Sequence, residues 1–228
     1  MEEKKKSIIV TEHVNRLYGM PGNEFQALKD VSLEVPEKTL TILRGRSGSG
    51  KTTLTNILGA LDKPNSGQVY ISGNEITHMS EHKRELLRRQ EIGFIFQSVS
   101  LIPMMSAFEN VEFALRLAGI SKGRKERVEK CLKMVGLGGR MNHMPQEMSG
   151  GEQQRVAIAR AIVHNPKIIL ADEPTAELDS ATAITVVNLF KEMVEKEGVT
   201  IIMTTHDTGL MGAGDVIYQL EDGELING

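Results

Sequence analysis

A glycine-rich segment offers the clearest chemistry in the sequence. It fits the pattern G-x-x-x-x-G-K-[ST], in which Gly45 and Gly50 enclose four residues and Lys51 and Thr52 follow. Glycines let backbone N–H groups turn inward around phosphate oxygens, and the N-terminus of a following helix adds positive dipole. Lys51 is predicted to reach the β- and γ-phosphates of a nucleotide, and the Thr52 hydroxyl to ligate Mg²⁺. The predicted nucleotide-binding residues are Gly45, Arg46, Ser47, Gly48, Ser49, Gly50, Lys51, Thr52 and Thr53.

Two adjacent carboxylates follow an apolar run at residues 168–171. The run is typical of a strand buried on both faces, and ligands of such sheets bind outside the carboxyl ends of the strands. Asp172 is therefore predicted to hold Mg²⁺ through its water shell, and Glu173 to polarise an attacking water as general base. Without the glycine-rich segment, the same pair would indicate only a turn and a helix cap.

A second anion site is predicted where a helix begins after Met148. Its first residues are Ser149, Gly150, Gly151 and Glu152, and free N–H groups at a helix N-terminus attract anions. The chain thus carries two different half-sites for phosphate. The glycine-rich segment alone is compatible with kinases, GTPases, helicases and transport ATPases, but no N-K-x-D sequence follows it, which disfavours a GTPase.

The elements that position these residues follow from the hydrophobic pattern. Short β-branched runs alternate with longer helical patterns, which is typical of a mostly parallel sheet covered by helices. The opening segments instead predict neighbouring strands in an antiparallel portion, at residues 7–14, 27–35 and 40–43. Further strands are predicted at residues 68–71, 92–96, 167–171, 199–203 and 216–220.

Helices are predicted to follow Lys51, Ser80, Ser106, Ser121, Gly150 and Ser180. The S-x-x-E sequence at residues 106–109 is a capping box, and residues 106–139 are helical throughout in pattern. We therefore expect an α/β fold over residues 1–228 as a single domain. It combines a P-loop NTPase core of mostly parallel sheet, an N-terminal antiparallel β portion, and a helical subdomain within residues 98–160.

Composition excludes several classes of protein. The 228 residues include 27 basic and 30 acidic side chains, and a net charge of −3 disfavours a general nucleic-acid binder. The single cysteine, Cys131, excludes an internal disulfide and a thiolate zinc cluster. No run approaches the ~18 apolar residues of a membrane span. A cytoplasmic location is the simplest expectation.

The order of the motifs resembles the nucleotide-binding subunit of an ATP-binding cassette (ABC) transporter. The resemblance covers residues 8–223 and rests on the glycine-rich segment, Gln97, S-G-G-E-Q at 149–153, I-L-A-D-E-P at 169–174, and His206. It implies a homodimer that closes around two ATP molecules. Each nucleotide would lie between the P-loop of one copy and the Ser-Gly-Gly motif of the other, with Mg²⁺ as the second cofactor.

The resemblance also implies roles for single residues. Gln97 would reach Mg²⁺ and the attacking water and sense a membrane partner, and His206 would contact the γ-phosphate. Asp179 would cross the dimer interface, and Tyr18 would stack on adenine. Glu152, where glutamine is common in the family, places a carboxylate near nucleotide phosphates and is expected to weaken closure.

Loops at residues 61–67, 92–97 and 101–103 are similar to the subgroup that serves lipoprotein release, macrolide export and antimicrobial-peptide resistance. This similarity implies an ATPase that drives a separate permease from the inner face of the membrane. Residues 98–105 would either line the groove for that permease or belong to the core. The alternatives are a cell-division-type regulatory ATPase, and a soluble cassette protein acting on ribosomes or DNA. Soluble cassette proteins of this kind usually carry two cassettes in one chain or a long coiled-coil insertion, whereas this sequence has one P-loop and no heptad tract.

Overall fold

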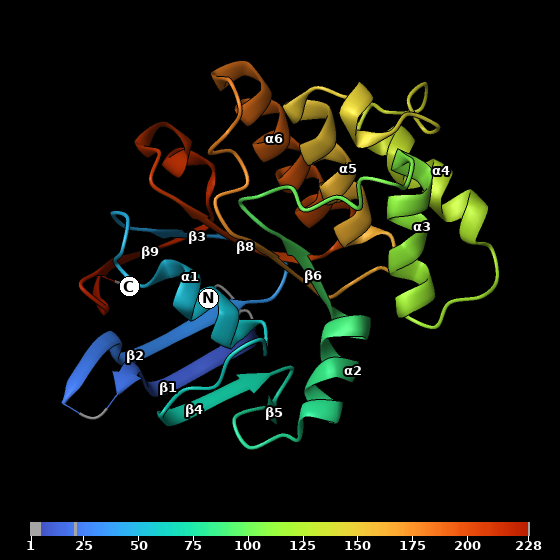
Figure 1. The fold of residues 1–228 in the computed structure, drawn as a ribbon. Coiled ribbons are helices and arrows are strands. Elements are labelled where there is room, and N and C mark those ends of the chain that lie inside the picture. The colour runs from blue at the N-terminus through green and yellow to red at the C-terminus, as the bar shows by residue number, and fades with distance from the viewer. Residues whose placement is uncertain (1–5, 21, 228) are drawn as a thin grey trace.

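The computed structural model describes residues 6–20 and 22–227, which form two sheets and the helices around them (Figure 1). A four-stranded sheet has the order β2-β1-β4-β5, and a six-stranded sheet has the order β10-β9-β3-β8-β7-β6. The strands are β1 (Ser7–Met20), β2 (Asn23–Pro36), β3 (Leu40–Arg44), β4 (Ser66–Ile71), β5 (Asn74–Glu75), β6 (Ile92–Ile95), β7 (Ile168–Ala171), β8 (Thr200–Thr205), β9 (Val216–Glu221) and β10 (Glu224–Asn227).

The helices occur where the sequence predicts them. They are α1 (Lys51–Leu58), α2 (Glu81–Glu91), α3 (Ala107–Leu117), α4 (Arg124–Met134), α5 (Gly150–Ile162) and α6 (Ser180–Glu197), with 3₁₀ turns η1 (Pro145–Glu147) and η2 (Thr208–Ala213). The predicted capping box begins α3, because Ser106 Oγ accepts from the Glu109 amide and the Glu109 carboxylate accepts from the Ser106 amide.

The predicted fold class is confirmed, with one correction to the strands. The first sheet is antiparallel throughout, and the second is parallel except for the β9–β10 pair. The segment 40–43 was expected beside the two opening strands, but β3 pairs with β8 and β9 in the parallel sheet. The physical reason is burial on both faces, since Leu40 and Ile42 face one core cluster and Leu43 faces the other.

The six-stranded sheet separates two apolar cores. On β7, Ile169 and Ala171 pack toward α3–α6, whereas Ile168 and Leu170 pack toward α1 and the antiparallel sheet. This alternation follows from the period of two along a strand. Figure 1 shows the result, with α5 and α6 over one face and α1 between the two sheets.

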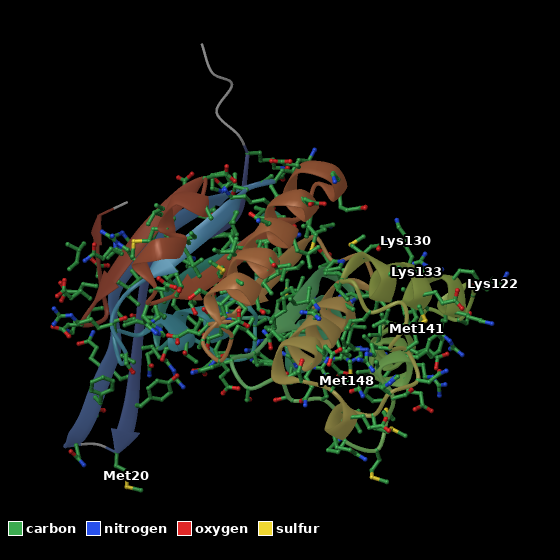
Figure 2. The ribbon with its side chains drawn as sticks, turned by 90° about the horizontal axis from the view of Figure 1, so that it is seen from above. Met20, Lys122, Lys130, Lys133, Met141 and Met148 are labelled. Carbon is green, nitrogen blue, oxygen red and sulfur yellow. The ribbon has the colours of Figure 1, made fainter. Side chains whose placement is uncertain are left out.

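The β1–β2 hairpin is longer than the sequence predicts. Pairing continues through Tyr18–Phe25 to Met20–Asn23, and several register shifts interrupt it. Figure 2 shows Met20 at the end of a ribbon that projects from the body of the molecule. The residues at the tip of the hairpin are exposed, so their sequence lacks the alternation of apolar and polar residues that indicates a half-buried strand. Within the described residues, no helix combines the length and apolar character that crossing a membrane requires.

Cys131 provides a test of the packing between α4 and the rest of the molecule. Its side chain is 8% exposed, and burial raises the pKa of the thiol to about 11. Only the thiolate is nucleophilic, and at pH 8 about one Cys131 side chain in a thousand would be in the thiolate form. We therefore predict that the folded protein reacts slowly with iodoacetamide, and that denaturant restores the rate of an ordinary thiol. Rapid labelling of the folded chain, measured by intact mass, would contradict the observed packing.

Candidate functional site

The glycine-rich loop joins β3 to α1 and is packed tightly against neighbouring strands. A Cβ at Gly45 would stand 2.3 Å from the Leu220 carbonyl oxygen, and one at Gly50 would stand 2.6 Å from the Ala27 carbonyl oxygen. Gly50 also has φ +103°, which side chains rarely adopt. Glycine is thus required at both ends of the loop, where the backbone must turn directly into the helix.

The ammonium group of Lys51 lies inside this loop. Its Nζ donates to the Gly45 carbonyl oxygen at 2.8 Å and to the Arg46 carbonyl oxygen at 3.1 Å. It also lies 3.3 Å from Glu173 Oε1, and the lysine side chain is only 4% exposed. A buried charge needs such partners. The loop therefore encloses one positive charge. That charge also contacts the carboxylate of Glu173, in the turn that follows β7.

Thr52 and Asp172 meet where α1 begins and β7 ends. Thr52 Oγ1 donates to Asp172 Oδ2 at 2.8 Å, so one side chain from the loop and one from the sheet edge are joined. Thr204, fully buried on β8, donates to the other carboxylate oxygen at 2.7 Å. The Asp172 carboxylate is thereby held on both oxygens.

Glu173 lies between two cationic or cation-forming groups. Its Oε2 is 3.0 Å from His206 Nδ1, while its Oε1 faces Lys51. The backbone of Glu173 has φ +45°, and its amide donates to Thr204 Oγ1 at 2.8 Å. The structure thus brings together five of the predicted site residues, namely Lys51, Thr52, Asp172, Glu173 and His206.

Thr204 is a site residue that the sequence analysis did not identify. One hydroxyl donates to Asp172 and accepts from the Glu173 amide, so it fixes both carboxylates relative to β8. The available signal was a polar residue at the end of an otherwise apolar run, just before Thr205 and His206. The sequence predicts a strand that ends at residue 203, whereas β8 continues through Thr205.

The Ser-Gly-Gly motif forms the N-terminus of α5. Ser149 Oγ accepts from the Glu152 amide at 3.2 Å, and Glu152 Oε2 accepts from the Ser149 amide at 2.9 Å. Arg140 Nε lies 3.3 Å from Glu152 Oε1. The hydrogen bond from the Ser149 amide is the main reason that the pKa of Glu152 lies below its ordinary value. The Glu152 carboxylate therefore caps the N-terminus of α5, the helix to which it belongs.

Other predicted residues lie apart from the Lys51–Glu173 group. Gln97 is exposed two residues beyond β6, and Tyr18 is 39% exposed on β1. Asp179 caps α6, accepting from the amides of Ala181 and Thr182 at 3.0 Å each. Across the described ranges, no hydrogen bond joins Gln97, Tyr18, Asp179 or Ser149 to that group.

Gln154 connects the Ser-Gly-Gly helix to the carboxylate turn. Its Nε2 donates to the Pro174 carbonyl oxygen at 2.8 Å, and the side chain is 2% exposed. Gly151 lies close to the first turn of α6, because a Cβ there would stand 3.3 Å from Thr182 Cγ2. The N-terminus of α5 and the cap of α6 thus lie side by side. Gln154 was not predicted as a site residue.

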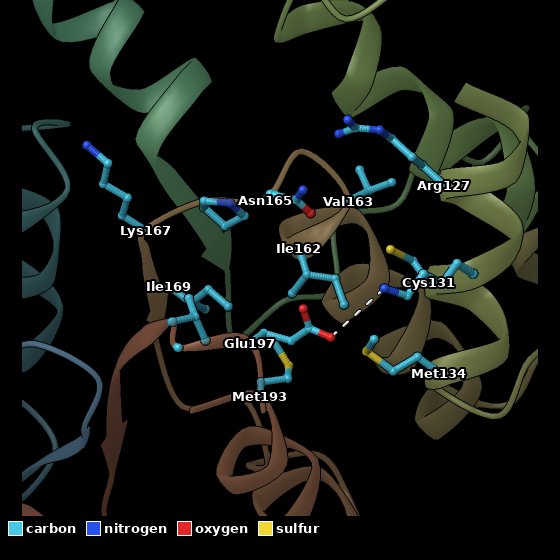
Figure 3. A pocket seen from close by; sticks show the side chains of 14 residues that line it. Arg127, Cys131, Met134, Ile162, Val163, Asn165, Lys167, Ile169, Met193 and Glu197 are labelled. Atoms are coloured by element: carbon cyan, nitrogen blue, oxygen red, sulfur yellow. Dashed lines mark ion pairs between the residues drawn. The ribbon is translucent and has the colours of Figure 1, made fainter. Parts of the chain in front are cut away.

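A cavity of about 500 Å³ lies elsewhere, between α4, α6 and the turn before β7. Lys130 Nζ and Glu197 Oε1, from two of its lining residues, are 4.0 Å apart. Figure 3 shows the cavity and marks this ion pair of Glu197 with a dashed line. Pro166 and Val199 belong to its wall, which places it at the amino ends of β7 and β8. The predicted chemistry lies at the carboxyl ends of these strands, so this cavity is separate from it.

The residues present fit a phosphate chain and Mg²⁺. The Ser49 hydroxyl is buried in the loop without a hydrogen-bond partner in the described structure, close to Gly45, where a Cβ would stand 2.5 Å from Ser49 Oγ. In the same residues, no group of three or more His, Cys, Asp or Glu side chains could hold a metal alone. The Thr52–Asp172 pair instead suits Mg²⁺, which keeps several waters and is bound by few protein ligands and by substrate phosphates.

Comparison with known proteins identifies the family. A family model described as ABC transporter matches residues 28–176. The chain belongs to the ABC transporter family. It is 46% identical over 220 residues to the ABC transporter ATP-binding protein MJ1508 of Methanocaldococcus jannaschii, covering 96% of this chain and 98% of that protein.

Solved structures place the chain among the ABC ATPases. The dimeric cassette MJ0796, in a post-hydrolysis state bound to ADP and Pi, has a TM-score of 0.89 and 41% identity, covering 96% of this chain and 97% of that one. The macrolide export ATP-binding/permease protein MacB of Syntrophobacter fumaroxidans is 42% identical over 221 residues, which cover 96% of this chain and 31% of that protein. The chain is therefore an ABC-type ATP hydrolase, as its motifs predicted.

The reciprocal cap at Ser149 predicts how Glu152 contributes to stability. We expect Glu152→Ala to lower the free energy of unfolding at pH 7 by less than about 1 kcal/mol, since the cap is partly exposed. Glu152→Gln should retain most of it, because glutamine also completes a capping box. Urea unfolding of the three proteins would measure the difference.

The pH dependence of this contribution has a defined sign. Because the pKa of Glu152 is lowered on folding, its stabilisation is present above the ordinary carboxyl pKa and is lost as pH falls through the folded value. The parent and Glu152→Gln should therefore converge in acid. An alanine variant as stable as the parent at pH 7 would contradict the cap.

Proposed function

We propose that this ABC ATPase works as a homodimer that drives a separate membrane-spanning permease of the export type. The observation that carries the proposal is the Glu173 carboxylate, held between Lys51 and His206 beside the Thr52–Asp172 pair. This arrangement supplies a base, a phosphate-binding cation and a metal-binding edge at one place. Each is needed for hydrolysis of a phosphoanhydride in water.

In this proposal the glycine-rich loop binds the phosphates of ATP. Residues 45–53 offer backbone N–H groups, and Lys51 exchanges a carbonyl contact for phosphate oxygens. Thr52, Asp172 and Gln97 would hold Mg²⁺, which neutralises phosphate charge when bound. Tyr18 would stack on the adenine base. The buried, unpartnered Ser49 hydroxyl supports a polar occupant of the loop.

Glu173 is the proposed general base. Its carboxylate takes a proton from water as the water oxygen bonds to the γ-phosphorus, and the bond from that phosphorus to the bridging oxygen breaks. The products are ADP and phosphate, and the proton leaves with the phosphate. His206 would orient the carboxylate through the 3.0 Å contact and would contact the γ-phosphate at the same edge of the sheet.

Two copies are needed to complete each site in this proposal. Ser149, Gly150, Gly151 and Glu152 of one copy would face the ATP held by the other, and Asp179 would cross between them. Gly150 is exposed and Gly151 is partly exposed, and their amides lie in the first turn of α5, where N–H groups have no intrahelical partner. This favours an anion from outside the chain. The structures of MJ0796 are described as dimeric, one of them with ADP and Pi.

The permease would dock in a groove of about 480 Å³ formed by α2, β6, α3 and α5. Phe94 and Phe96, whose ring centroids are 5.7 Å apart, are stacked among its lining residues, which also include Arg88 and Arg89. Ser100 and Ile102 also line the groove, whereas Leu101 packs against the core. Residues 98–105 thus contribute side chains both to this groove and to the apolar core. Docking here would hold the ATPase at the inner face of the membrane.

Substitution of Glu173 tests the catalytic proposal. Glu173→Gln should reduce phosphate release by about 100-fold or more, because the amide cannot accept the proton of the attacking water. ATP binding should persist, so light scattering should detect an ATP-dependent dimer that accumulates. Glu195→Gln, an exposed carboxylate on α6, serves as the control and should match the parent. Parent-level turnover in Glu173→Gln would reject Glu173 as the base.

Substitution of Lys51 tests nucleotide binding. Lys51→Ala should weaken ATP binding by about 100-fold or more, since it removes the buried cation of the loop. Isothermal calorimetry would measure this loss, and thermal unfolding without nucleotide would report whether the variant folds. Lys125→Ala, whose side chain is exposed in the parent, is the matched control. Unchanged affinity in Lys51→Ala would reject the phosphate site.

A further inference from the structure

Tyr18 is fixed in place by two residues that no catalytic role explains. Its hydroxyl donates to Asp62 Oδ2 at 2.8 Å, and the Arg16 guanidinium carbon lies 4.3 Å from the centre of its ring. Arg16 in turn donates to both Asp62 oxygens, at 2.8 and 3.0 Å. The three side chains therefore form a closed triangle of two hydrogen-bonded pairs and one cation–π contact.

The triangle is rigidly mounted on the loop that follows α1. Asp62 Oδ1 also accepts from the Lys63 amide at 2.7 Å, and the Asp62 carbonyl oxygen accepts from the buried Arg84 on α2 at 2.8 Å. Asn65 Oδ1 accepts from Arg16 and from the Leu17 amide. Both sides of the contact are thus anchored, although the β1–β2 hairpin itself projects into solvent.

Arg16 and Asp62 form a charged pair within the triangle. Partial burial raises the pKa of Asp62, but hydrogen bonds from Tyr18, the Lys63 amide and Arg16 outweigh it, so the pKa lies below its ordinary value. The carboxylate is therefore charged at neutral pH. The Arg16 and Asp62 side chains are 21% and 25% exposed, which gives the ion pair more strength than a fully solvated one.

Tyr18 lies on the strand pair that flanks the glycine-rich loop. Gly50 packs against Ala27 and Leu28 of β2, and Leu28 pairs with Arg16 across the β1–β2 ladder. Tyr18 is two residues further along β1, a distance of about 7 Å. One face of its ring is covered by Arg16, and the tyrosine remains 39% exposed.

We propose that Asp62 and Arg16 are positioning residues that hold the Tyr18 ring for the base of ATP. They thereby set the preference of the site for a nucleotide over a bare triphosphate. The inference rests on the proposed contact between Tyr18 and adenine. A ring that is already ordered does not lose rotamer freedom on binding, which otherwise costs part of the stacking energy.

The test compares two ligands, ATP and inorganic tripolyphosphate, each with Mg²⁺. Tyr18→Ala should weaken ATP binding about tenfold and leave tripolyphosphate binding unchanged, because only ATP carries a base. Asp62→Ala and Arg16→Met should weaken ATP binding about three- to tenfold, also without effect on tripolyphosphate. In steady-state kinetics this should raise KM while kcat stays within about twofold of the parent.

Two further variants separate positioning from folding. Arg16→Lys keeps the cation but not the paired hydrogen bonds to both Asp62 oxygens, so it should restore only part of the ATP affinity lost in Arg16→Met. Asp30→Asn removes the carboxylate that His13 contacts at 2.7 Å on the same hairpin, away from Tyr18, and should behave as the parent. Tripolyphosphate binding reports in every variant that the glycine-rich loop is folded.

The outcomes distinguish this inference from the proposed function. If Tyr18→Ala keeps the parent ratio of ATP to tripolyphosphate affinity, the adenine contact itself fails and the inference falls with it. If Tyr18→Ala lowers that ratio while Asp62→Ala and Arg16→Met do not, the base contact stands and the positioning role is overturned. Equal loss of both ligands in Asp62→Ala would also overturn it, since it would indicate a structural role.

Discussion

The buried ammonium group of Lys51 is the interaction on which the rest of the site depends. It is held by two loop carbonyl oxygens and faces Glu173, so one positive charge organises both the loop and the carboxylate turn. Such a charge is costly away from water unless its partners are in place. The loop must therefore curve around it, and that curvature requires the glycines that pack against β2 and β9.

The parallel sheet supplies the second half of the arrangement. Strands β3, β8 and β7 are adjacent and parallel, so their carboxyl ends deliver the glycine-rich loop, His206 and Asp172 to one edge. Thr204 then links β8 to the turn after β7 through a single hydroxyl. The site is positioned by backbone pairing first, and side-chain hydrogen bonds refine it. This order explains why a short motif after each strand is sufficient.

Sequence alone predicted the parts of the site that lie directly after strands. Asp172 follows an apolar run and Lys51 belongs to the glycine-rich motif after another, and parallel strands bring such ends together, whereas His206 was expected from the resemblance to the ABC family. The partner of β3 was predicted wrongly, because an apolar run does not state which sheet it joins. The contact of Tyr18 with Asp62 and that of Gln154 with Pro174 were also missed. They join residues far apart in sequence, and spacing carries no information about such pairs.

The strand order also affects how the protein is made. Leu40 pairs with Ile201, and Thr41 pairs with Val216, so both neighbours of β3 come from the last part of the chain. Residues 200–221 must leave the ribosome before β3 can be enclosed, and contacts of such long range slow folding. The antiparallel sheet, built from residues 7–75, can form earlier. The strand that leads into the glycine-rich loop is thus paired on both sides only once residues 200–221 have been made, whereas the antiparallel sheet does not require them.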